Sequence, residues 1–499
     1  MNEDRGESKS RHQASPDKKA SPHEKASPHE KASPHEKARL GHRVVRVQPA
    51  RRIAFEVISA VRESDAYANL LLPVKLERAK LSAQDAAFAT ELSYGTLRRL
   101  GYYDAVLEIA AGRSAREIDA PILDVLRLGA HQLLSMRVAS HAAVDESVSL
   151  AREVGSQSAS GFVNAVLRTI TRSGVDEWHH RVLSSAQSDD ERLSLEYSHP
   201  VWIVRAFRQS LSAEGREDEL VELLGADNVA PRVNLVALPG LATLDELDGV
   251  HQASYSPFGA ISDGGDPSQF TAVREGRARV QDEGSQLAAL ALSRARPIIP
   301  GERWLDLCAG PGGKAALLAA EALAGGAVLV ANEVAPTRAK LVRTALSVFA
   351  DPPQVLVQDG TELGERLPGQ FDRILLDAPC TGLGALRRRP EARWRKHPND
   401  VAELAVLQGA LLRSAVKALK PGGILAYVTC SPHAGETRAA VAGLLAAVGD
   451  SVTQLDTGAI LSTVTTHPIE LGENTGQVQL WPHRHGTDAM FICLLHKHE

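Results

Sequence analysis

The sequence predicts a multidomain protein: an all-α N-terminal bundle, a small α+β linker domain and a C-terminal α/β domain with a mainly parallel sheet. The chain has 499 residues, which is too long for one ordinary core. Helical periodicity without strand-like runs fills residues 47–173, whereas short apolar runs alternate with helix-length segments after residue 300. Such alternation implies right-handed crossovers, and therefore a parallel sheet with helices on both faces.

The first segment, residues 1–45, predicts a disordered low-complexity tail. The six-residue unit "ASPDKK" is followed by three copies of "ASPHEK". The repeat has no aromatic or β-branched residue, so it cannot bury enough surface to offset the entropy of ordering. Its histidines are compatible with weak metal binding, but a solvated tail is the simpler interpretation.

Residues 46–175 predict a helical bundle. The apolar side chains of "RRIAFEVISAVRE" recur at helical spacing and share one face. The stretch "DAPILDVLRLGAHQLLSMRV" predicts another helix, with Asp119 as the N-cap and Pro121 in the first turn. Basic residues slightly outnumber acidic ones in this region, which does not make it a basic domain.

Residues 176–278 predict a connector of further helices followed by a small α+β segment. "PRVNLVAL" is the first clear strand, because it is short and rich in apolar residues. Residues 279–499 predict the α/β domain. Its strands all end in polar or reactive residues: "RWLDLC", "AVLVANE", "QVLVQD", "DRILLDAP" and "GILAYVTCS". Ligands of such sheets bind at the carboxyl ends of the strands, so we expect the functional site there.

The composition excludes several classes of protein. Four cysteines without a CxxC pair argue against a disulfide scaffold or a zinc finger and favour a reducing cytoplasm. The polar N-terminus predicts no signal peptide, and no apolar run reaches the roughly 18 residues that a membrane span needs. The net charge is −5, so any nucleic-acid surface must be local. We therefore expect a cytoplasmic monomer that needs neither a membrane nor a metal ion.

A glycine-rich turn joins the first strand of the α/β domain to its first helix. In "LDLCAGPGGKA" three glycines let the backbone approach a ligand closely, and the helix offers its N-terminal amides. A phosphate-binding P-loop would need Gly at 308 and Ser or Thr at 315, where the chain has Cys308 and Ala315. The dinucleotide motif also fails, because residue 315 is not glycine. The predicted cofactor loop is Cys308, Ala309, Gly310, Pro311, Gly312, Gly313 and Lys314.

An acidic residue ends each of the next three strands. Glu333 follows the second strand at about the interval at which an acid meets ribose hydroxyls in nucleoside-binding folds. Asp359 ends the third strand, in position to meet an adenine amino group, and Asp377 ends the fourth. One such acid is often only solvated surface, but a set of three indicates a ligand. The implied ligand is an adenosine without a phosphate requirement, which predicts S-adenosylmethionine.

Three motifs resemble the RsmB/Nop/Sun family of RNA (cytosine-5) methyltransferases: "LDLCAGPGGK", "LLDAPCTGLGALRRRPEARWR" and "YVTCSP". Two stretches of the helical region resemble the NusB-like extension of RsmB-type enzymes, which modify small-subunit ribosomal RNA: "AVDESVSLAREV" and "SGFVNAVLR". Near the end of the chain, "PHRHGTDAMF" resembles the closing strand pair of the family. The resemblance covers roughly residues 45–499.

The resemblance implies a function for each domain. Residues 46–175 would be a NusB-like helical RNA-binding domain, and residues 279–499 a Rossmann-like, S-adenosylmethionine-dependent methyltransferase domain. The expected reaction is methylation of C5 of a cytosine in small-subunit (16S) ribosomal RNA. Another RNA, such as a tRNA, is the alternative substrate.

The family resemblance also implies roles for two cysteines. Cytosine C5 is too electron-poor to take a methyl group from a sulfonium directly, so a thiolate must first add to C6. Cysteine suits this step because it is both a good nucleophile and a good leaving group. By family correspondence Cys430 is the nucleophile, and Cys380 assists breakdown of the covalent product. Asp377 is expected to position the base, and Lys314 to hold the base or the methionine end of the cofactor.

A basic stretch, "LRRRPEARWRK", follows soon after Cys380. Its charges could hold the phosphates of an RNA strand, with an aromatic side chain for stacking. A solvated charge run is the alternative. The predicted RNA contacts are Arg387, Arg388, Arg389, Arg393, Trp394 and Arg395.

Two other functions fit part of the sequence. A DNA cytosine-5 methyltransferase would use a Pro-Cys nucleophile such as Pro379-Cys380, but Cys430, the NusB-like region and the lack of an obvious large DNA target-recognition domain oppose it. A non-catalytic RNA-binding factor of the NusB type would have a decayed catalytic domain, whereas here the loop, the acids and both cysteines are intact.

Overall fold

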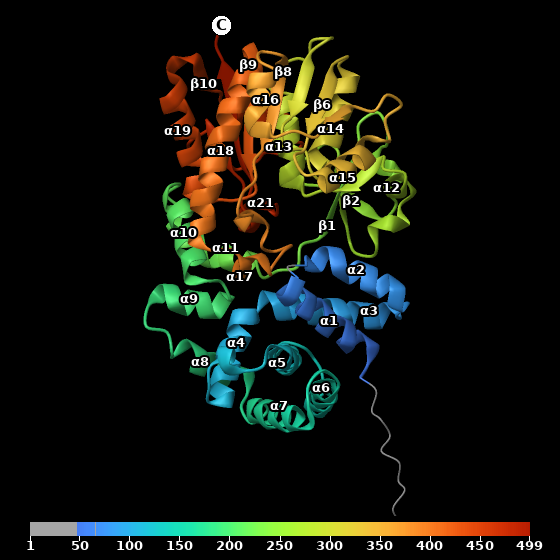
Figure 1. The fold of residues 1–499 in the computed structure, drawn as a ribbon, viewed down its shortest axis with the longest axis vertical. Coiled ribbons are helices and arrows are strands. Elements are labelled where there is room, and N and C mark those ends of the chain that lie inside the picture. Colours follow the sequence, from blue (N-terminus) through green and yellow to red (C-terminus); the bar gives the residue numbers. More distant parts are fainter. Residues whose placement is uncertain (1–46, 65) are drawn as a thin grey trace, which may run out of the picture. The chain divides into compact units, whose positions relative to one another are not determined.

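The computed structural model describes residues 47–64 and 66–499, so the predicted tail at residues 1–45 lies outside the described residues. The first part of the described chain is helical (Figure 1). Its α-helices are α1 (Pro49–Ser64), α2 (Ala68–Ala79), α3 (Ala83–Arg98), α4 (Leu100–Ala111), α5 (Ala120–Leu134), α6 (Ser140–Val154), α7 (Gln157–Ile170), α8 (Val175–Leu183), α9 (Asp189–Tyr197), α10 (Val201–Ser212) and α11 (Leu220–Ala226).

Apolar stripes hold these helices together. Side chains from α1 to α8 form one buried core, which includes the fully buried Trp178 of α8. In α1, Ile53, Val57, Ile58 and Val61 are all buried, as their helical spacing predicts. The helix predicted after Asp119 is α5; Asp119 occupies the N-cap position, but its side chain makes no capping hydrogen bond.

A small antiparallel sheet follows the helical part and has the strand order β2-β3-β1-β4. The strand predicted from "PRVNLVAL" is β1, and it pairs with both β3 and β4. Leu235 and Ala260 lie in a separate small core beneath this sheet. Its elements are β1 (Val233–Ala237), β2 (Val250–Gln252), β3 (Gly259–Ser262), α12 (Thr271–Arg274) and β4 (Ala278–Val280).

The remainder of the chain forms an eight-stranded sheet with helices on both faces. Its strands are β5 (Arg303–Asp306), β6 (Val328–Asn332), β7 (Gln354–Leu356), β8 (Phe371–Asp377), β9 (Leu419–Thr429), β10 (Val452–Gln454), β11 (Gln477–Gln479) and β12 (Phe491–Lys497). Its helices are α13 (Glu283–Ser293), α14 (Gly313–Ala324), α15 (Pro336–Leu346), α16 (Gly360–Arg366), α17 (Ala392–Arg395), α18 (Pro398–Ala418), α19 (Arg438–Val448), α20 (Thr457–Val464) and α21 (Pro482–His485).

The strand order is β10-β12-β9-β8-β5-β6-β7, and β11 pairs with β12. The five strands from β5 to β9 run parallel, whereas β12 is antiparallel to β9. One core packs α13, α14, α15 and α20 against one face of the sheet, and another packs α16, α18 and α19 against the other. The predicted fold class, a helical region followed by an α/β domain with a mainly parallel sheet, is confirmed.

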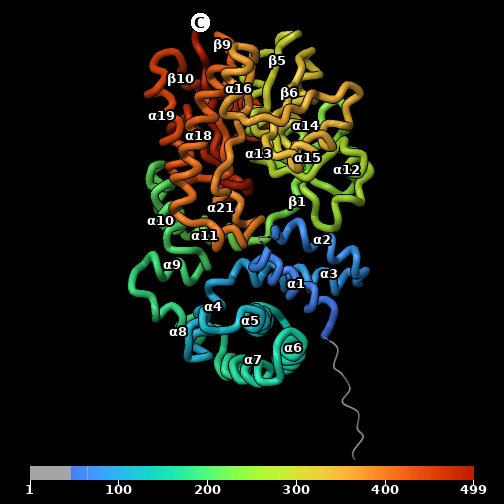
Figure 2. Tube along the Cα trace, viewed as in Figure 1, coloured from blue at the N-terminus to red at the C-terminus, as the bar shows by residue number. Residues whose placement is uncertain are grey.

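The topology brings distant parts of the sequence to one edge of the sheet. Strands β8 and β9 are neighbours, with Asp377 opposite Val428 in register, so the loops after them leave the sheet side by side. Strand β5 lies on the other side of β8, which places the loop after β5 at the same edge. Figure 2 follows this path from the helices in blue and green to the sheet in yellow, orange and red. All predicted site residues follow one of these strands or their neighbours.

Candidate active site

The predicted cofactor loop leads from the end of β5 into α14. Gly312 occupies the N-cap of α14 with a φ of +111°, and an added Cβ there would lie 2.5 Å from the Cβ of Ala345. A Cβ at Gly310 would lie 2.2 Å from Glu333 Oε2. Both positions therefore require glycine, the first for its backbone conformation and the second for close approach of a carboxylate.

Glu333 follows β6 and closes over this loop. Its buried carboxylate accepts hydrogen bonds from the amides of Gly310 (3.1 Å) and Ala335 (3.0 Å). Arg338, in the first turn of α15, donates to Gly310 O at 2.5 Å and lies 3.6 Å from the Glu333 carboxylate. Arg338 is a contact of the loop that the sequence pattern did not indicate.

Five buried polar atoms, from three side chains near the loop, have no hydrogen-bond partner among the described residues. They are both carboxylate oxygens of Asp306, both side-chain polar atoms of Gln281, and Oε1 of Gln358. Burial, and next the negative charge of Asp377, raise the pKa of Asp306 to about 8. Buried polar groups are normally paired, so these atoms point to a ligand that supplies their partners. The sequence did contain a signal for Asp306: it is a charged residue at the end of an apolar strand, just before the glycine-rich turn.

Asp359 takes a different position from Glu333. It is the N-cap of α16, and its Oδ1 accepts hydrogen bonds from the amide (2.9 Å) and hydroxyl (2.7 Å) of Thr361. These two bonds lower the pKa of the Asp359 carboxyl. The side chain is exposed, so it caps the helix and leaves its second oxygen, Oδ2, available at the edge of the sheet.

Lys314 and Asp377 form an ion pair at the end of β8, with Nζ 2.9 Å from Oδ2. Burial lowers the pKa of the Lys314 ammonium, but the charge of Asp377 and the hydrogen bond to it outweigh burial and raise it. Lys314 therefore stays a cation next to the thiols. The pair also fixes the Asp377 carboxylate, which remains partly exposed.

The loops after β8 and β9 bring two cysteines into contact. The sulfur of Cys380 lies 3.4 Å from that of Cys430. This hydrogen bond is the largest cause that lowers the pKa of Cys430 and raises that of Cys380 well above its ordinary value. Lys314 and Arg389 lower the pKa of Cys430 further, whereas burial and Asp377 oppose them. The arrangement favours a thiolate at Cys430 that accepts a hydrogen bond from a thiol at Cys380.

The other two cysteines lie apart from this pair. Burial raises the pKa of both Cys308 and Cys493, the latter to about 12. Cys493 packs within β12, in the core on the α18 side of the sheet. Neither thiol has the environment of a reactive cysteine.

The arginines predicted to contact RNA mostly have partners within the protein. Arg387 and Arg388 both bind Asp282 and Asp488, at distances between 2.7 and 2.9 Å. Arg393 is fully buried; it donates to the carbonyls of Arg98, Ser198 and Asp227 and to the side chain of Asn228. These acidic and carbonyl partners come from distant parts of the chain, so the sequence of the basic stretch alone could not reveal them. The prediction of RNA contact is therefore unsupported for Arg387, Arg388 and Arg393.

Trp394, Arg395 and Arg389 complete this segment. The ring of Trp394 packs on Gly101 of α4, where an added Cβ would lie 2.4 Å from the ring. Arg395 donates to the carbonyls of Val61 and Ala66. Arg389 is exposed and places its guanidinium 5.2 Å from the ring centre of Tyr67. Of the predicted RNA contacts, Arg389 is the one that is exposed and whose charge lowers the pKa of Cys430.

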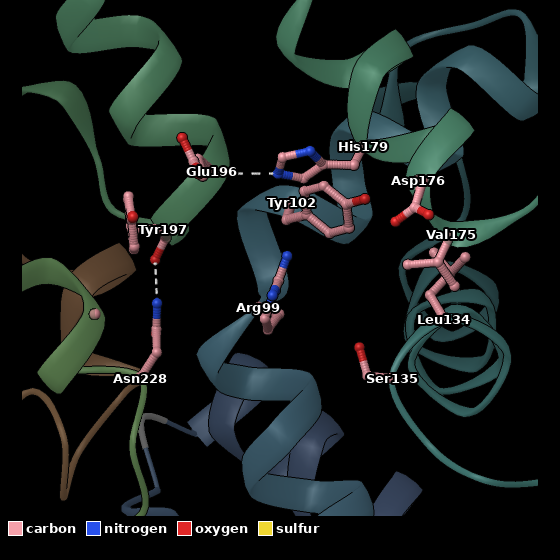
Figure 3. A pocket seen from close by; sticks show the side chains of 11 residues that line it. Arg99, Tyr102, Leu134, Ser135, Val175, Asp176, His179, Glu196, Tyr197 and Asn228 are labelled. Atoms are coloured by element: carbon pink, nitrogen blue, oxygen red, sulfur yellow. Dashed lines mark hydrogen bonds and ion pairs between the residues drawn. The ribbon is translucent and has the colours of Figure 1, made fainter. Parts of the chain in front are cut away.

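A cavity of about 470 Å³ lies elsewhere, between α4, α5 and the connector helices (Figure 3). Tyr102, His179 and Tyr197 are among its lining residues, and Arg99 stacks on Tyr102 at 4.4 Å. None of the predicted site residues lines it.

In the described part of the chain, no group of three or more His, Cys, Asp or Glu side chains could hold a metal ion. No helix within residues 47–64 or 66–499 is long and apolar enough to cross a membrane.

Comparison with known proteins decides the family. Residues 297–496 match the family model for the 16S rRNA methyltransferase RsmB/F, and residues 48–172 match the NusB family. A putative methyltransferase of Mycobacterium tuberculosis is 48% identical over 463 residues, which are 92% of this chain and 98% of that protein. The chain belongs to the RsmB/F methyltransferase family. It is therefore an S-adenosylmethionine-dependent RNA methyltransferase with a NusB-like helical region, as its motifs predicted.

One further relative supports the assignment to the RsmB/F family, and one solved structure shows the extent of the fold. The probable ribosomal RNA small subunit methyltransferase B of Bacillus subtilis is 30% identical over 459 residues, covering 90% of this chain and 98% of that protein. The crystal structure of PH0851 has the same fold: it aligns with a TM-score of 0.74 and 23% identity over 91% of this chain and 100% of that one. The shared fold thus extends through the helical region, the small sheet and the large sheet.

Proposed function

We propose that this protein transfers a methyl group from S-adenosylmethionine to C5 of a cytosine in small-subunit (16S) ribosomal RNA, with Cys430 as the nucleophile. The contact between the two thiols carries this proposal. The two sulfur atoms lie 3.4 Å apart. The pKa of Cys430 is lowered, whereas the pKa of Cys380 is raised. Methyl transfer to an already nucleophilic atom needs no thiol, whereas attack on a pyrimidine ring needs one to add and later leave.

The residues around the loop after β5 fit the proposed cofactor. The unpaired carboxylate of Asp306 suits the ammonium of its methionine end, and the unpaired amide of Gln281 offers both a donor and an acceptor there. Gly310 and Gly312 leave no side chain at two points of the loop where a Cβ would collide with Glu333 and Ala345. Glu333 would hold the ribose hydroxyls, and Asp359 Oδ2 the adenine amino group. When bound, S-adenosylmethionine supplies an electrophilic methyl group on a sulfonium.

The chain's own residues would perform the remaining chemistry. The Cys430 thiolate would add to C6 of cytosine and open the C5–C6 double bond. The electron pair at C5 would then take the methyl group as the bond from the methyl carbon to the sulfonium sulfur breaks, which leaves a neutral thioether. Loss of the C5 proton to a base then restores the double bond as the bond from Cys430 Sγ to C6 breaks and the thiolate leaves. Cys380 touches Cys430 and is placed to exchange protons during this elimination. Asp377, fixed by Lys314, would hydrogen-bond the edge of the base.

The RNA substrate is proposed from the family and from the surface near the thiols. The Bacillus subtilis relative is named as a small subunit methyltransferase, and the matched family model describes a 16S rRNA methyltransferase. Arg389 is exposed and its positive charge lowers the pKa of Cys430, so it could meet a phosphate of the target strand. The NusB-like helices would add RNA affinity and target choice. Such a substrate, together with free cysteines, fits a protein that acts in the cytoplasm.

The test is a map of 5-methylcytosine across ribosomal RNA and tRNA from a strain that lacks the gene. One 5-methylcytosine of 16S ribosomal RNA should be lost, and it should return with the wild-type gene but not with Cys430→Ser. Loss of a tRNA mark instead would move the substrate to tRNA. An unchanged map would contradict the proposed function altogether.

A further inference from the structure

The two cysteine loops are joined by a carboxylate that lies outside both of them. Cys380 is followed by Thr381, and Cys430 is followed by Ser431. Glu436 is fully buried at the end of a short 3-10 turn, Ala434–Glu436, that follows the second loop. Its side chain reaches both residues that follow the cysteines.

Each oxygen of Glu436 has a defined donor. Oε1 accepts a hydrogen bond from the amide of Thr381 at 2.7 Å. Oε2 accepts from the hydroxyl of Thr381 at 2.5 Å and from the hydroxyl of Ser431 at 2.6 Å. Hydrogen bonds to a buried carboxylate are charge-assisted and stronger than neutral ones. One anion therefore holds the backbone next to Cys380 and the side chain next to Cys430 at the same time.

Neighbouring side chains hold Glu436 itself in place. Gln408 of α18 donates to Pro379 O at 2.8 Å and lies 3.4 Å from Glu436 Oε1. Tyr427 of β9 donates its hydroxyl to the backbone carbonyl of Glu436 at 2.8 Å. The carboxylate is thus anchored to the sheet and to α18, and it cannot move without both loops moving.

The charge of Glu436 is placed unevenly between the two thiols. Two of its hydrogen bonds go to Thr381, which is adjacent to Cys380. On the other side Lys314 presents a positive charge toward Cys430. A negative charge on one side and a positive charge on the other favour a proton on Cys380 and a thiolate at Cys430. Consistent with this, the charge of Glu436 is one of the causes that raise the pKa of Cys380, after the Cys430 hydrogen bond, burial and the charge of Cys430.

We propose that Glu436 is a positioning residue of the reaction: its carboxylate fixes the contact between the two sulfurs and keeps the shared proton on Cys380. This inference rests on the proposed function, because it assigns Glu436 a role in making Cys430 the attacking thiol. Glu436 need not touch the RNA or the cofactor. It acts through Thr381 and Ser431.

The main experiment compares Glu436→Gln with wild type in two assays. Glutamine has the same shape but no charge, and its amide can still meet the hydroxyls if they rotate. In the first assay, without RNA, iodoacetamide labels the thiols at several pH values, and mass spectrometry of the two peptides gives the rate at each cysteine. Wild type should label Cys430 in preference to Cys380, and Glu436→Gln should reduce that preference about tenfold.

The second assay measures methyl transfer. In Glu436→Gln, kcat should fall by about tenfold to a hundredfold, while KM for RNA and the affinity for S-adenosylmethionine stay within twofold. Glu403→Gln, an exposed glutamate on α18, is the matched control and should match wild type in both assays. If Glu436→Gln does not fold, Ser431→Ala and Thr381→Val each remove one donor and should change both readouts in the same direction.

The outcomes separate this inference from the proposed function. An active wild type together with a Glu436→Gln enzyme of unchanged kcat and unchanged labelling preference would overturn the inference alone. Unchanged behaviour of both Ser431→Ala and Thr381→Val would do the same if the first variant cannot be purified. A wild type that makes no 5-methylcytosine in RNA would instead remove the proposed function, whatever the labelling shows.

Discussion

The sulfur atoms of Cys380 and Cys430 lie 3.4 Å apart, although the residues are 50 positions apart in the sequence. The contact exists because β8 and β9 are parallel neighbours and each cysteine lies in the loop at the carboxyl end of its strand. A thiol and a thiolate in contact divide two tasks that one cysteine performs poorly. In the proposed reaction one sulfur attacks the base, and the other holds a proton nearby.

The two cysteines should fail in different ways when replaced by serine. Cys430→Ser has a hydroxyl that is hardly ionised near neutral pH, so no covalent complex should form. Cys380→Ser leaves attack and methyl transfer possible but slows elimination, so protein should accumulate joined to methylated RNA. On a denaturing gel with labelled RNA, only Cys380→Ser should give a shifted band.

The buried Cys493→Ala is the control for this pair and should give no shifted band. If Cys380 were instead the nucleophile, as in the Pro-Cys motif of DNA cytosine-5 enzymes, the adduct would need Cys380, and Cys430→Ser would be the variant that accumulates it. A shifted band from Cys430→Ser alone would show that the two roles are exchanged.

Glu333→Ala should weaken S-adenosylmethionine binding by about tenfold or more. Two ribose hydroxyls on one carboxylate make charge-assisted hydrogen bonds worth roughly 1.5–3 kcal/mol each. The change also removes the acceptor for the Gly310 amide, which loosens the loop. Calorimetry measures the dissociation constant, and the exposed Glu362→Ala of α16 should leave it unchanged. An unaltered affinity in Glu333→Ala would remove this carboxylate from the site.

Arg393→Met should destabilise the protein without abolishing cofactor binding. Arg393 lies in α17, and its loss would leave buried carbonyls of Arg98 and Asp227 without a donor. It would also remove the cation that does most to lower the pKa of the buried Asp227. Removing one partner of a buried charged network typically costs about 3–5 kcal/mol. Thermal unfolding should show a clearly lower Tm.

The control for this prediction is Arg413→Met, an exposed position on α18 that should change stability by less than about 0.5 kcal/mol. If Arg393→Met is as stable as Arg413→Met but loses RNA affinity, Arg393 is an RNA contact after all.

Asp306 should contribute a loss of stability to the cofactor-free protein as pH rises from about 4 to 8. In the folded state the pKa of Asp306 is raised to about 8, whereas an unfolded aspartate ionises near about 4. Between these values the folded protein holds a proton that the unfolded chain has released, so rising pH favours unfolding. One such group gives a slope of about −1.4 kcal/mol per pH unit within that range and none above it.

Asp306→Asn should remove this contribution. Urea unfolding between pH 5 and 9 would compare the two proteins, and wild type should lose stability more steeply than the variant below pH 8. Parallel curves for the two proteins would show that Asp306 is ionised in the folded state.

Arg389→Ala should weaken RNA binding more than any change in its buried arginine neighbours. A phosphate contact contributes through counterion release, so the variant should reduce the slope of log K against log salt by about one. Filter binding at several salt concentrations measures this slope. An unchanged slope would exclude Arg389 from the RNA surface, and the exposed Arg366→Ala of α16 serves as the control.

The sequence by itself determined the fold class and the edge of the sheet at which the site lies. Apolar runs of strand length alternate with helical segments, and this pattern has few compact solutions. Because reactive residues follow the strands, the parallel topology alone collects Lys314, Asp377, Cys380 and Cys430 at one edge. Short-range sequence patterns suffice here because strand direction fixes which ends meet.

Only the tertiary structure decided which charges are available. The basic stretch after Cys380 has the composition of a surface, yet Arg387 and Arg388 pair with Asp282 and Asp488 from distant segments, and Arg393 is fully buried. The hydrogen bonds by which Glu436 connects the two cysteine loops also depend on which elements pack together. The same is true of the carboxylate of Asp306, which has no hydrogen-bond partner. Burial and partner choice are long-range properties of the chain, because they depend on contacts between segments that no local pattern contains.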